Sequence, residues 1–171
     1  MNSSTASRCR IGHGYDLHRL EPLAPAGAGR PLILGGMPLG GDVGPVGHSD
    51  GDVLFHAVTD ALLGSVGHAD IGQLFPDTDP RHDGADSEIF LRAAVDVLQD
   101  AGYGLINLDA TVICERPRIG PIKERLIDNL ARVLLCDRSR INVKGKTHEG
   151  VDAVGEGRAI EVHCVVLVER A

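Results

Sequence analysis

The sequence predicts an α/β fold, a single-domain two-layer sandwich in which helices pack on one face of one mixed sheet. Three observations support this prediction. A chain of 171 residues is long enough for one core and too short for two comfortable domains. Segments with helical spacing alternate with segments typical of strands, and this alternation favours helices layered on a sheet. We expect residues 1–9 to be a disordered leader and residues 10–170 to form the domain.

The first half of the chain contains two short strands and the first helix. Apolar residues predict strands near 9–11 and 32–34, separated by a loop rich in Pro and Gly at 21–31. A helix is expected over residues 50–66, with Ser49 as its N-cap and Asp52 three residues later.

The second helix is expected over residues 87–101. Its apolar residues have helical spacing, which predicts that they form the buried face: Ile89, Ala93, Val97 and Ala101. Gly102 stands where a glycine commonly ends a helix.

The second half continues the alternation of strands and helices. Residues 107–114 alternate as a half-buried strand does. Pro121 is expected to open a third helix that runs to Leu135. Two strands follow at 141–146 and 159–169, and the last is long enough to be central or to line a subunit interface. The residues predicted to be buried are Leu108, Ala110, Val112, Ile122, Leu126, Leu130 and Val133.

Composition and charge exclude several classes of partner. A net charge of −7 with 3% aromatic residues argues against nucleic acid. No apolar run approaches the roughly 20 residues that cross a membrane. The four cysteines are far apart and form no C-x-x-C pair, which suits a reducing cytoplasm better than a disulfide framework. We therefore expect a soluble cytoplasmic protein that binds phosphates through metal ions, backbone N–H groups and a few cations.

Two segments combine into a candidate metal site. Asp16 and His18 stand two apart in G-H-G-Y-D-L-H, so on an extended chain both side chains leave the same face. Alone, this pair is better explained by a turn Asp and a surface His than by a metal site. His56 lies in the first predicted helix beside several polar residues, and Asp60 could orient its ring. Two histidines and one carboxylate leave a coordination position open, as in catalytic Zn²⁺ sites, and Mn²⁺ or Co²⁺ would suit the same ligands.

Three further segments could bind an anion or hydroxyl groups. His48 and Ser49 lie at the start of the first predicted helix, where free N–H groups attract anions, although simple capping is the alternative. Residues 69–80 contain three carboxylates that fit either hydroxyl binding or turn chemistry. Residues 144–149, with Arg118, supply the cations, hydroxyl and carboxylate that a metal-bridged diphosphate requires. A solvated charged turn is the other interpretation of that last segment.

Taken together, three motifs resemble the 2-C-methyl-D-erythritol 2,4-cyclodiphosphate synthase family. They are G-H-G-Y-D-L-H, H-S-D-G-D-V-L-F-H-A-V-T-D-A-L-L-G and D-I-G-Q-L-F-P-D-T-D-P, in this order. The resemblance implies that residues 10–170 form one catalytic domain and that the protein is a homotrimer with interfacial active sites. It also implies a lyase of non-mevalonate isoprene biosynthesis, which converts 4-diphosphocytidyl-2-C-methyl-D-erythritol 2-phosphate to the 2,4-cyclodiphosphate and releases CMP.

The resemblance also implies roles for individual residues. Zn²⁺ is expected on Asp16, His18 and His56, and Mg²⁺ or Mn²⁺ on Glu149 through the substrate diphosphate. His48 and Thr147 are implied as the catalytic residues that stabilise the transition state. Contacts with the cytidine diphosphate substrate are implied for Asp16, His18, His48, Ser49, Asp70, Gly72, Phe75, Asp77, Asp79, Cys114, Pro117, Arg118, Gly120, Lys146, Thr147 and Glu149.

The expected reaction needs no covalent residue. The 2-phosphate of the substrate attacks its own β-phosphate, so the protein positions the two groups and neutralises their charge. Two alternatives stay open. A metal-dependent phosphoester hydrolase would need a water nucleophile and a base, for which His48 is the candidate. A zinc-stabilised trimeric binding protein without turnover would need a fourth protein ligand.

Two features depart from the family pattern. Arg118 stands where a lysine is common, which preserves the charge but changes the hydrogen-bond geometry. The segment T-H-E-G-V-D-A-V-G-E-G lacks the Phe and Arg of the form G-F-T-G-R-G-E-G. In some members those residues line an axial cavity that holds an isoprenoid phosphate. Their loss argues against such a ligand here, whereas the retained Glu156 leaves it open.

Overall fold

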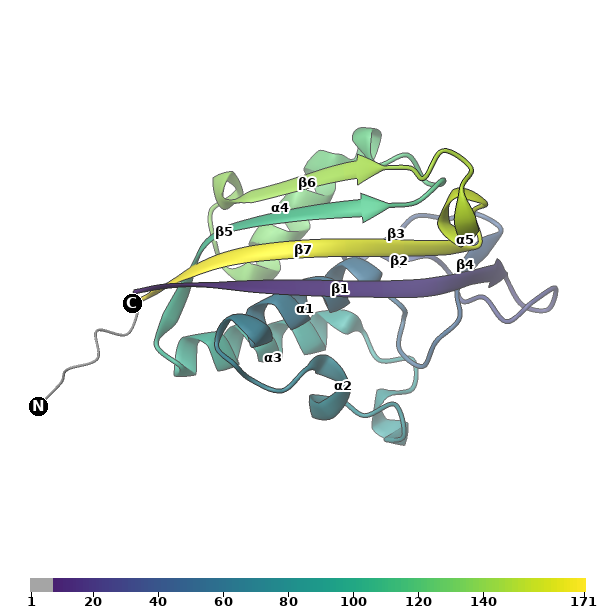
Figure 1. Ribbon diagram of the computed structural model, residues 1–171. Helices are drawn as coiled ribbons and strands as arrows, with labels where there is room; N and C mark the ends of the chain where they lie inside the picture. The colour runs from purple at the N-terminus through teal and green to yellow at the C-terminus, as the bar shows by residue number, and fades with distance from the viewer. Residues whose placement is uncertain (1–7) are drawn as a thin grey trace, which may run out of the picture.

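A five-stranded mixed sheet forms one layer of the computed structural model, which describes residues 8–171 (Figure 1). Its strand order is β4-β1-β7-β5-β6. Only the β5–β6 pair is parallel among these neighbours, and the other three pairs are antiparallel. A separate small sheet pairs β2 with β3. The strands are β1 (Cys9–Pro22), β2 (Ile33–Leu34), β3 (Met37–Pro38), β4 (Val43–Pro45), β5 (Tyr103–Ile113), β6 (Ile141–Lys146) and β7 (Ala159–Arg170).

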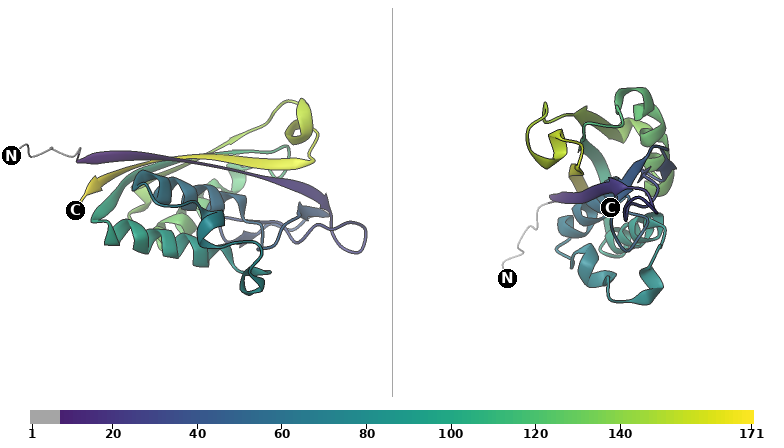
Figure 2. Two further views of the ribbon diagram at one scale, coloured as in Figure 1. Left: turned by 60° about the horizontal axis from the view of Figure 1, so that its bottom comes forward. Right: turned by 90° about the vertical axis from the view of Figure 1, so that its right-hand side faces the viewer.

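The three long helices form the second layer. They cover the same face of the sheet (Figure 2), which confirms the predicted two-layer arrangement. They are α1 (Val53–Ser65), α3 (Ser87–Asp100) and α4 (Lys123–Leu134). Shorter helices lie in the connections: α2 (Ile71–Leu74), α5 (Asp152–Gly155), and the 3₁₀ turns η1 (Pro80–His82), η2 (Gly120–Ile122) and η3 (Arg138–Arg140). No helix within residues 8–171 is long and apolar enough to cross a membrane.

The N-terminal strand differs from the prediction in length. β1 begins at Cys9, as expected for the first strand. Of the predicted leader, residues 1–7 lie outside the part of the chain that the structure describes. β1 runs through the whole G-H-G-Y-D-L-H motif rather than ending near residue 11. Asp16 and His18 are therefore on an extended strand, as the metal-site hypothesis requires.

The first helix starts later than predicted. α1 begins at Val53, and its N-cap is Asp52 rather than Ser49. The Asp52 carboxylate is completely buried and accepts hydrogen bonds from the N–H groups of Leu54 and Phe55. It also accepts from the N–H groups of Gly35 and Gly36, which ties the β2–β3 turn to the helix. A carboxylate with two oxygens satisfies four backbone donors here, which the single hydroxyl of a serine could not do.

The second helix is where it was predicted, but its buried face is not. α3 spans Ser87–Asp100, and Gly102 follows it with a φ of +77°. Ile89 was predicted to be buried and is 58% exposed. The helix contacts α1, α4 and β5 together, so the face turned toward these elements is the one that is buried. Its buried apolar residues are Phe90, Leu91, Ala94, Val95 and Leu98.

Two glycines let α1 lie directly on β1. A Cβ at Gly12 would stand 1.8 Å from the carbonyl oxygen of Ala61, and one at Gly14 would stand 1.8 Å from that of Ala57. These distances leave no room for any side chain. The alternate glycines of β1 therefore allow the helix backbone to approach the strand, which places His56 of α1 above Asp16.

The core lies between the sheet and the helices. Leu108, Ala110 and Val112 of β5 are buried as predicted, and so are Leu126, Leu130 and Val133 of α4. Ile122, also predicted to be buried, is only half-buried against the core. β7 is the central strand between β1 and β5, in agreement with one of the two predictions for it.

The other side of the sheet has no helix layer over it (Figure 2). We refer to this side as the open face. It carries exposed apolar and aromatic side chains from β1 and β7, which alternate with buried residues along each strand. The most exposed are Ile11 at 73%, Tyr15 at 45%, Val165 at 45% and Leu17 at 43%. A patch of this kind on a sheet is typical of a protein–protein contact surface.

Candidate active site

Asp16, His18 and His56 meet at one point between β1 and α1. Asp16 Oδ2 lies 3.1 Å from His18 Nε2 and 3.0 Å from His56 Nδ1. The two imidazole rings stand nearly perpendicular, with centroids 5.2 Å apart. Within residues 8–171, this is the one group of at least three acidic, His or Cys side chains whose ligand atoms converge closely enough to hold a metal ion. The predicted metal cluster is thus brought together.

The remaining ring nitrogens are held by hydrogen bonds. His18 Nδ1 donates to the carbonyl oxygen of Gly51 at 2.9 Å, which leaves Nε2 free to coordinate. His56 Nε2 lies 2.8 Å from Ser87 Oγ, and the Ser87 hydroxyl donates to Asp50 in turn. This chain leaves Nδ1 of His56 as the coordinating atom.

The predicted role of Asp60 is wrong. Its carboxylate accepts a hydrogen bond from the N–H group of Ile71 instead of from His56. The His56 ring turns toward β1, because Asp16 holds one of its nitrogens and Ser87 holds the other. The orienting carboxylate is Asp50, which acts through Ser87 from the loop before α1.

The charge of the cluster favours a cation. Burial opposes protonation of His56, but its hydrogen bond to Asp16 and the nearby carboxylates raise the His56 pKa above its ordinary value. The same negative groups would attract a metal ion in place of that proton. The donor atoms lie about as far apart as ligands of one tetrahedral Zn²⁺, which are about 3.4 Å from each other. Three protein ligands leave one position for a substrate oxygen.

A cavity of about 180 Å³ opens beside the cluster. His18 and His56 form one wall, and the segment after α1 forms another. Three aromatic rings, Phe75, His82 and Phe90, pack against one another in its lining. Five residues predicted to bind substrate line this cavity with His18: His48, Ser49, Gly72, Phe75 and Asp77.

The anion site expected at the start of α1 is not formed by the helix itself. The Asp52 carboxylate occupies the first N–H groups, so they are closed to a phosphate. Ser49 caps no helix; its hydroxyl accepts from the N–H group of Gly51 and lies 3.3 Å from His56 Nε2. His48 and Ser49 nevertheless line the same cavity as His18 and His56, so any contact with phosphate would come from His48 and Ser49 themselves and not from the helix terminus.

Asp70 and Asp79 have turn roles in the structure. Asp70 caps α2 and accepts from both the backbone and the side chain of Gln73. Asp79 caps η1 and pairs with Arg81, which lowers the Asp79 pKa to about 2. Neither residue belongs to the lining of the cavity beside the metal cluster. Asp77, the third carboxylate of this segment, does line it.

The other predicted residues form a second cavity, of about 660 Å³. β5 and β6 are parallel and end side by side, with Ile113 opposite Lys146. The loops after them therefore start from the same edge of the sheet, and the N–H group of Cys114 donates to the Lys146 carbonyl. The lining of this second cavity includes seven predicted residues: Cys114, Pro117, Arg118, Gly120, Lys146, Thr147 and Glu149.

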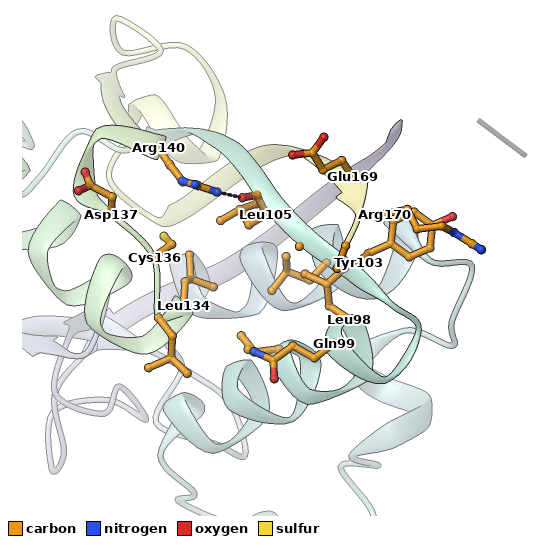
Figure 3. A pocket seen from close by; sticks show the side chains of 15 residues that line it. Leu98, Gln99, Tyr103, Leu105, Leu134, Cys136, Asp137, Arg140, Glu169 and Arg170 are labelled. Atoms are coloured by element: carbon orange, nitrogen blue, oxygen red, sulfur yellow. Dashed lines mark hydrogen bonds between the residues drawn. The ribbon is translucent and has the colours of Figure 1, made fainter. Parts of the chain in front are cut away.

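The two cavities share no lining residue in the described part of the chain. One lies between β1 and α1, whereas the other lies at the β5–β6 edge, with β7 between these strands. A further cavity of about 400 Å³, with Tyr103, Cys136 and Arg140 in its lining, contains none of the predicted residues (Figure 3). A single chain thus presents the predicted site as two separate halves.

Comparisons with known proteins agree with this geometry. The model of the YgbB family matches residues 9–169, nearly the whole chain. The chain belongs to the YgbB family. A rice chloroplastic 2-C-methyl-D-erythritol 2,4-cyclodiphosphate synthase is 55% identical over 94% of this chain and 70% of its own length. The corresponding synthase of Bordetella pertussis is 47% identical over 95% of this chain and 96% of its own length.

Solved YgbB-like structures share the fold. IspF of Plasmodium falciparum, in complex with CDP, has a TM-score of 0.83 and 38% identity over 96% of this chain and 99% of its own. The bifunctional IspDF of Campylobacter jejuni has a TM-score of 0.88 and 37% identity, and this chain covers 42% of it. The α/β fold with its mixed sheet is therefore that of known IspF structures.

Sequence reasoning missed several residues of this YgbB site. Asp50 and Ser87 orient His56 from 37 residues apart, and no periodic pattern connects them. Gly51 supplies the carbonyl group that holds His18. Its φ of +74° favours glycine, and a Cβ there would stand 2.5 Å from Pro45. The run H-S-D-G-D is polar in the sequence, but its contacts across the chain cannot be derived from spacing alone.

Proposed function

We propose that this protein is a cyclodiphosphate synthase that converts 4-diphosphocytidyl-2-C-methyl-D-erythritol 2-phosphate to 2-C-methyl-D-erythritol 2,4-cyclodiphosphate and releases CMP. Membership of the YgbB family and relatives of that name support the activity. The observation that carries the proposal is the Asp16–His18–His56 cluster, which has an open coordination position beside a cavity that contains His48 and Ser49.

A divalent ion, Zn²⁺ or alternatively Mn²⁺ or Co²⁺, would be held by Asp16 Oδ2, His18 Nε2 and His56 Nδ1. When bound, it would supply a Lewis acid that polarises the β-phosphate. The protein's own groups do the rest. Gly51 and Ser87 hold the two rings in the coordinating orientation, while His48 and Ser49 contact the phosphate and the methylerythritol part from the cavity wall.

The second cavity is proposed to bind the cytidine diphosphate part. Lys146 supplies a positive charge, Thr147 a hydroxyl donor, and Glu149 a carboxylate that can share Mg²⁺ or Mn²⁺ with the diphosphate. The loop from Cys114 to Gly120 surrounds the base, with Pro117 and Arg118 in the lining. Burial raises the pKa of Cys114 to about 11, so its thiol stays protonated and donates to the Pro117 carbonyl rather than acting as a nucleophile.

Both halves must act on one substrate molecule, and this supports a homotrimer. Because the metal half and the diphosphate half are separate on one chain, a complete site requires the two halves to come from neighbouring copies. The open face supplies the apolar surface on which copies can pack. His48 and Thr147, which lie in different cavities, would then stabilise the transition state from opposite sides.

We also propose that the protein acts in the cytoplasm. Cys114, Cys136 and Cys164 form no disulfide, as expected in a reducing compartment. Several plant relatives are named as chloroplastic, so the compartment is to be tested by imaging the tagged full-length chain in its own cells.

The test of the proposed function is ³¹P NMR of the purified protein with the diphosphocytidyl substrate, Zn²⁺ and Mg²⁺. The expected result is CMP together with two coupled cyclic-diphosphate resonances, both lost after chelation. Release of inorganic phosphate would instead favour the hydrolase. No reaction in metal-loaded protein that unfolds on chelation would favour a zinc-stabilised binding protein.

A further inference from the structure

The open face holds a cluster of polar rings that has no part in the proposed reaction. His13 and His163 project from β1 and β7 and are both exposed. The register pairs His13 with Val165 and Tyr15 with His163, so the two histidines are diagonal neighbours on the same side of the sheet. His13 Nε2 lies 3.3 Å from His163 Nδ1, and their rings stack with centroids 5.6 Å apart.

The surroundings of this pair suit a cation. The Tyr15 ring lies 4.8 Å from that of His163, and its hydroxyl donates to Glu161. Glu161 is buried, and its carboxylate also lies 3.4 Å from His148 Nε2. Glu161 stands two residues before His163 on β7, on the same side of the strand, and Val165 lies opposite His13 in the register.

We propose that His13 and His163 form a second metal site, separate from Asp16, His18 and His56, for a divalent transition ion such as Zn²⁺, Co²⁺ or Ni²⁺. The distance between their facing nitrogens matches the separation of about 3.4 Å between two ligands of a tetrahedral ion with metal–nitrogen bonds of about 2.1 Å. In the metal-free form the two nitrogens are within hydrogen-bond distance of each other. A metal ion bound between them would take the place of that contact.

Two protein ligands leave two positions of a tetrahedral ion open. The site lies on the face that, if the proposed homotrimer forms, packs against other copies. Each copy brings the same pair, so an ion shared by three copies would meet up to six imidazole nitrogens, an octahedral rather than a tetrahedral set, and would link subunits as well as strands. The inference therefore goes beyond the proposed function, and only the sharing of the ion between copies rests on it.

The test uses the full chain with His56→Ala, which removes one ligand of the first cluster. Chelator-treated protein is titrated with Co²⁺, and binding is followed by visible absorbance and calorimetry. We expect this variant still to bind Co²⁺, at one ion per chain for an independent pair or one per trimer for a shared site. His56→Ala/His163→Val should lose this binding, because valine suits an exposed strand position and cannot coordinate.

Two further variants keep the test decisive. His56→Ala/His68→Ala removes an exposed histidine elsewhere and should bind Co²⁺ as His56→Ala does. His56→Ala/His13→Gln removes the other proposed ligand and should lose binding even if the valine variant misfolds. Absence of Co²⁺ binding in folded His56→Ala, or equal binding in all of these variants, would overturn the proposal. The readout needs no turnover, so it is independent of whether the synthase assay succeeds.

Discussion

A single methyl group at Gly14 should disturb both stability and the metal cluster. In Gly14→Ala the new Cβ would stand 1.8 Å from the Ala57 carbonyl oxygen, 1.6 Å short of the 3.4 Å at which ordinary contact begins. The obstacle is the backbone of α1, which cannot rotate away as a side chain can. The helix must therefore move off β1 by an amount on the order of 1 Å.

The expected energies follow from this displacement. Overpacking of this kind costs about 1–3 kcal/mol, and the rigid obstacle favours the upper end. For a chain of this size, a loss of about 3 kcal/mol lowers Tm by roughly 6–12 °C. His56 moves with α1, so its contact of 3.0 Å with Asp16 is lost, and Zn²⁺ affinity should fall by about 10–100-fold.

The assay is differential scanning calorimetry at matched protein concentration, with Zn²⁺ affinity measured by chelator competition. Gly104→Ala is the matched control, because Gly104 is also in a strand and a Cβ there meets nothing within 4 Å. The free energy of unfolding of this control should lie within about 1 kcal/mol of that of the parent, and the control should bind Zn²⁺ equally well. If Gly14→Ala matched this control in both measurements, the close approach of α1 to β1 could not be what positions His56.

Three other predictions concern the metal cluster. His56→Ala should abolish turnover and Zn²⁺ binding at the Asp16 cluster while the circular dichroism spectrum is retained; an inactive variant with undiminished metal at that cluster would contradict the assignment. Ser87→Ala breaks the link to Asp50 and should weaken Zn²⁺ binding by about 10–100-fold, whereas Ser139→Ala on the exposed η3 turn should not. Because the His56 pKa is raised and the proton competes with the metal, Zn²⁺ affinity should be flat above that pKa and fall by roughly tenfold per pH unit below it. Affinity that rises on acidification would refute this coupling.

Local patterns in the sequence were sufficient for most elements. The alternation in residues 107–114 and the helical spacing in 122–133 report which side of a strand or helix is apolar, and β5 and α4 bear this out. The period of two along a strand is also enough to place Asp16 and His18 on one face, without reference to His56. The family resemblance of the motifs then assigned His56 to the same metal site, although His56 lies 40 residues from Asp16 in the sequence.

Other features depended on which element packs against which. The expected stripe of Ile89, Ala93 and Val97 on α3 was wrong because a second apolar stripe has the same helical spacing and contains larger side chains. That stripe is the side that contacts α1, α4 and β5, and it consists of Phe90, Leu91, Ala94, Val95 and Leu98. The cap of α1 is Asp52 because only a buried carboxylate could also bind the β2–β3 turn.

The sequence by itself determined the α/β alternation and the types of metal ligand, because both follow from residue chemistry and local period. Tertiary structure alone decided how the ligands are oriented and where the substrate-binding segments gather. The Asp50–Ser87–His56 chain joins loops and helices through contacts that no local spacing encodes. The separation of the predicted site into two cavities likewise depends on the order of strands in the sheet, which is set by packing of the whole chain.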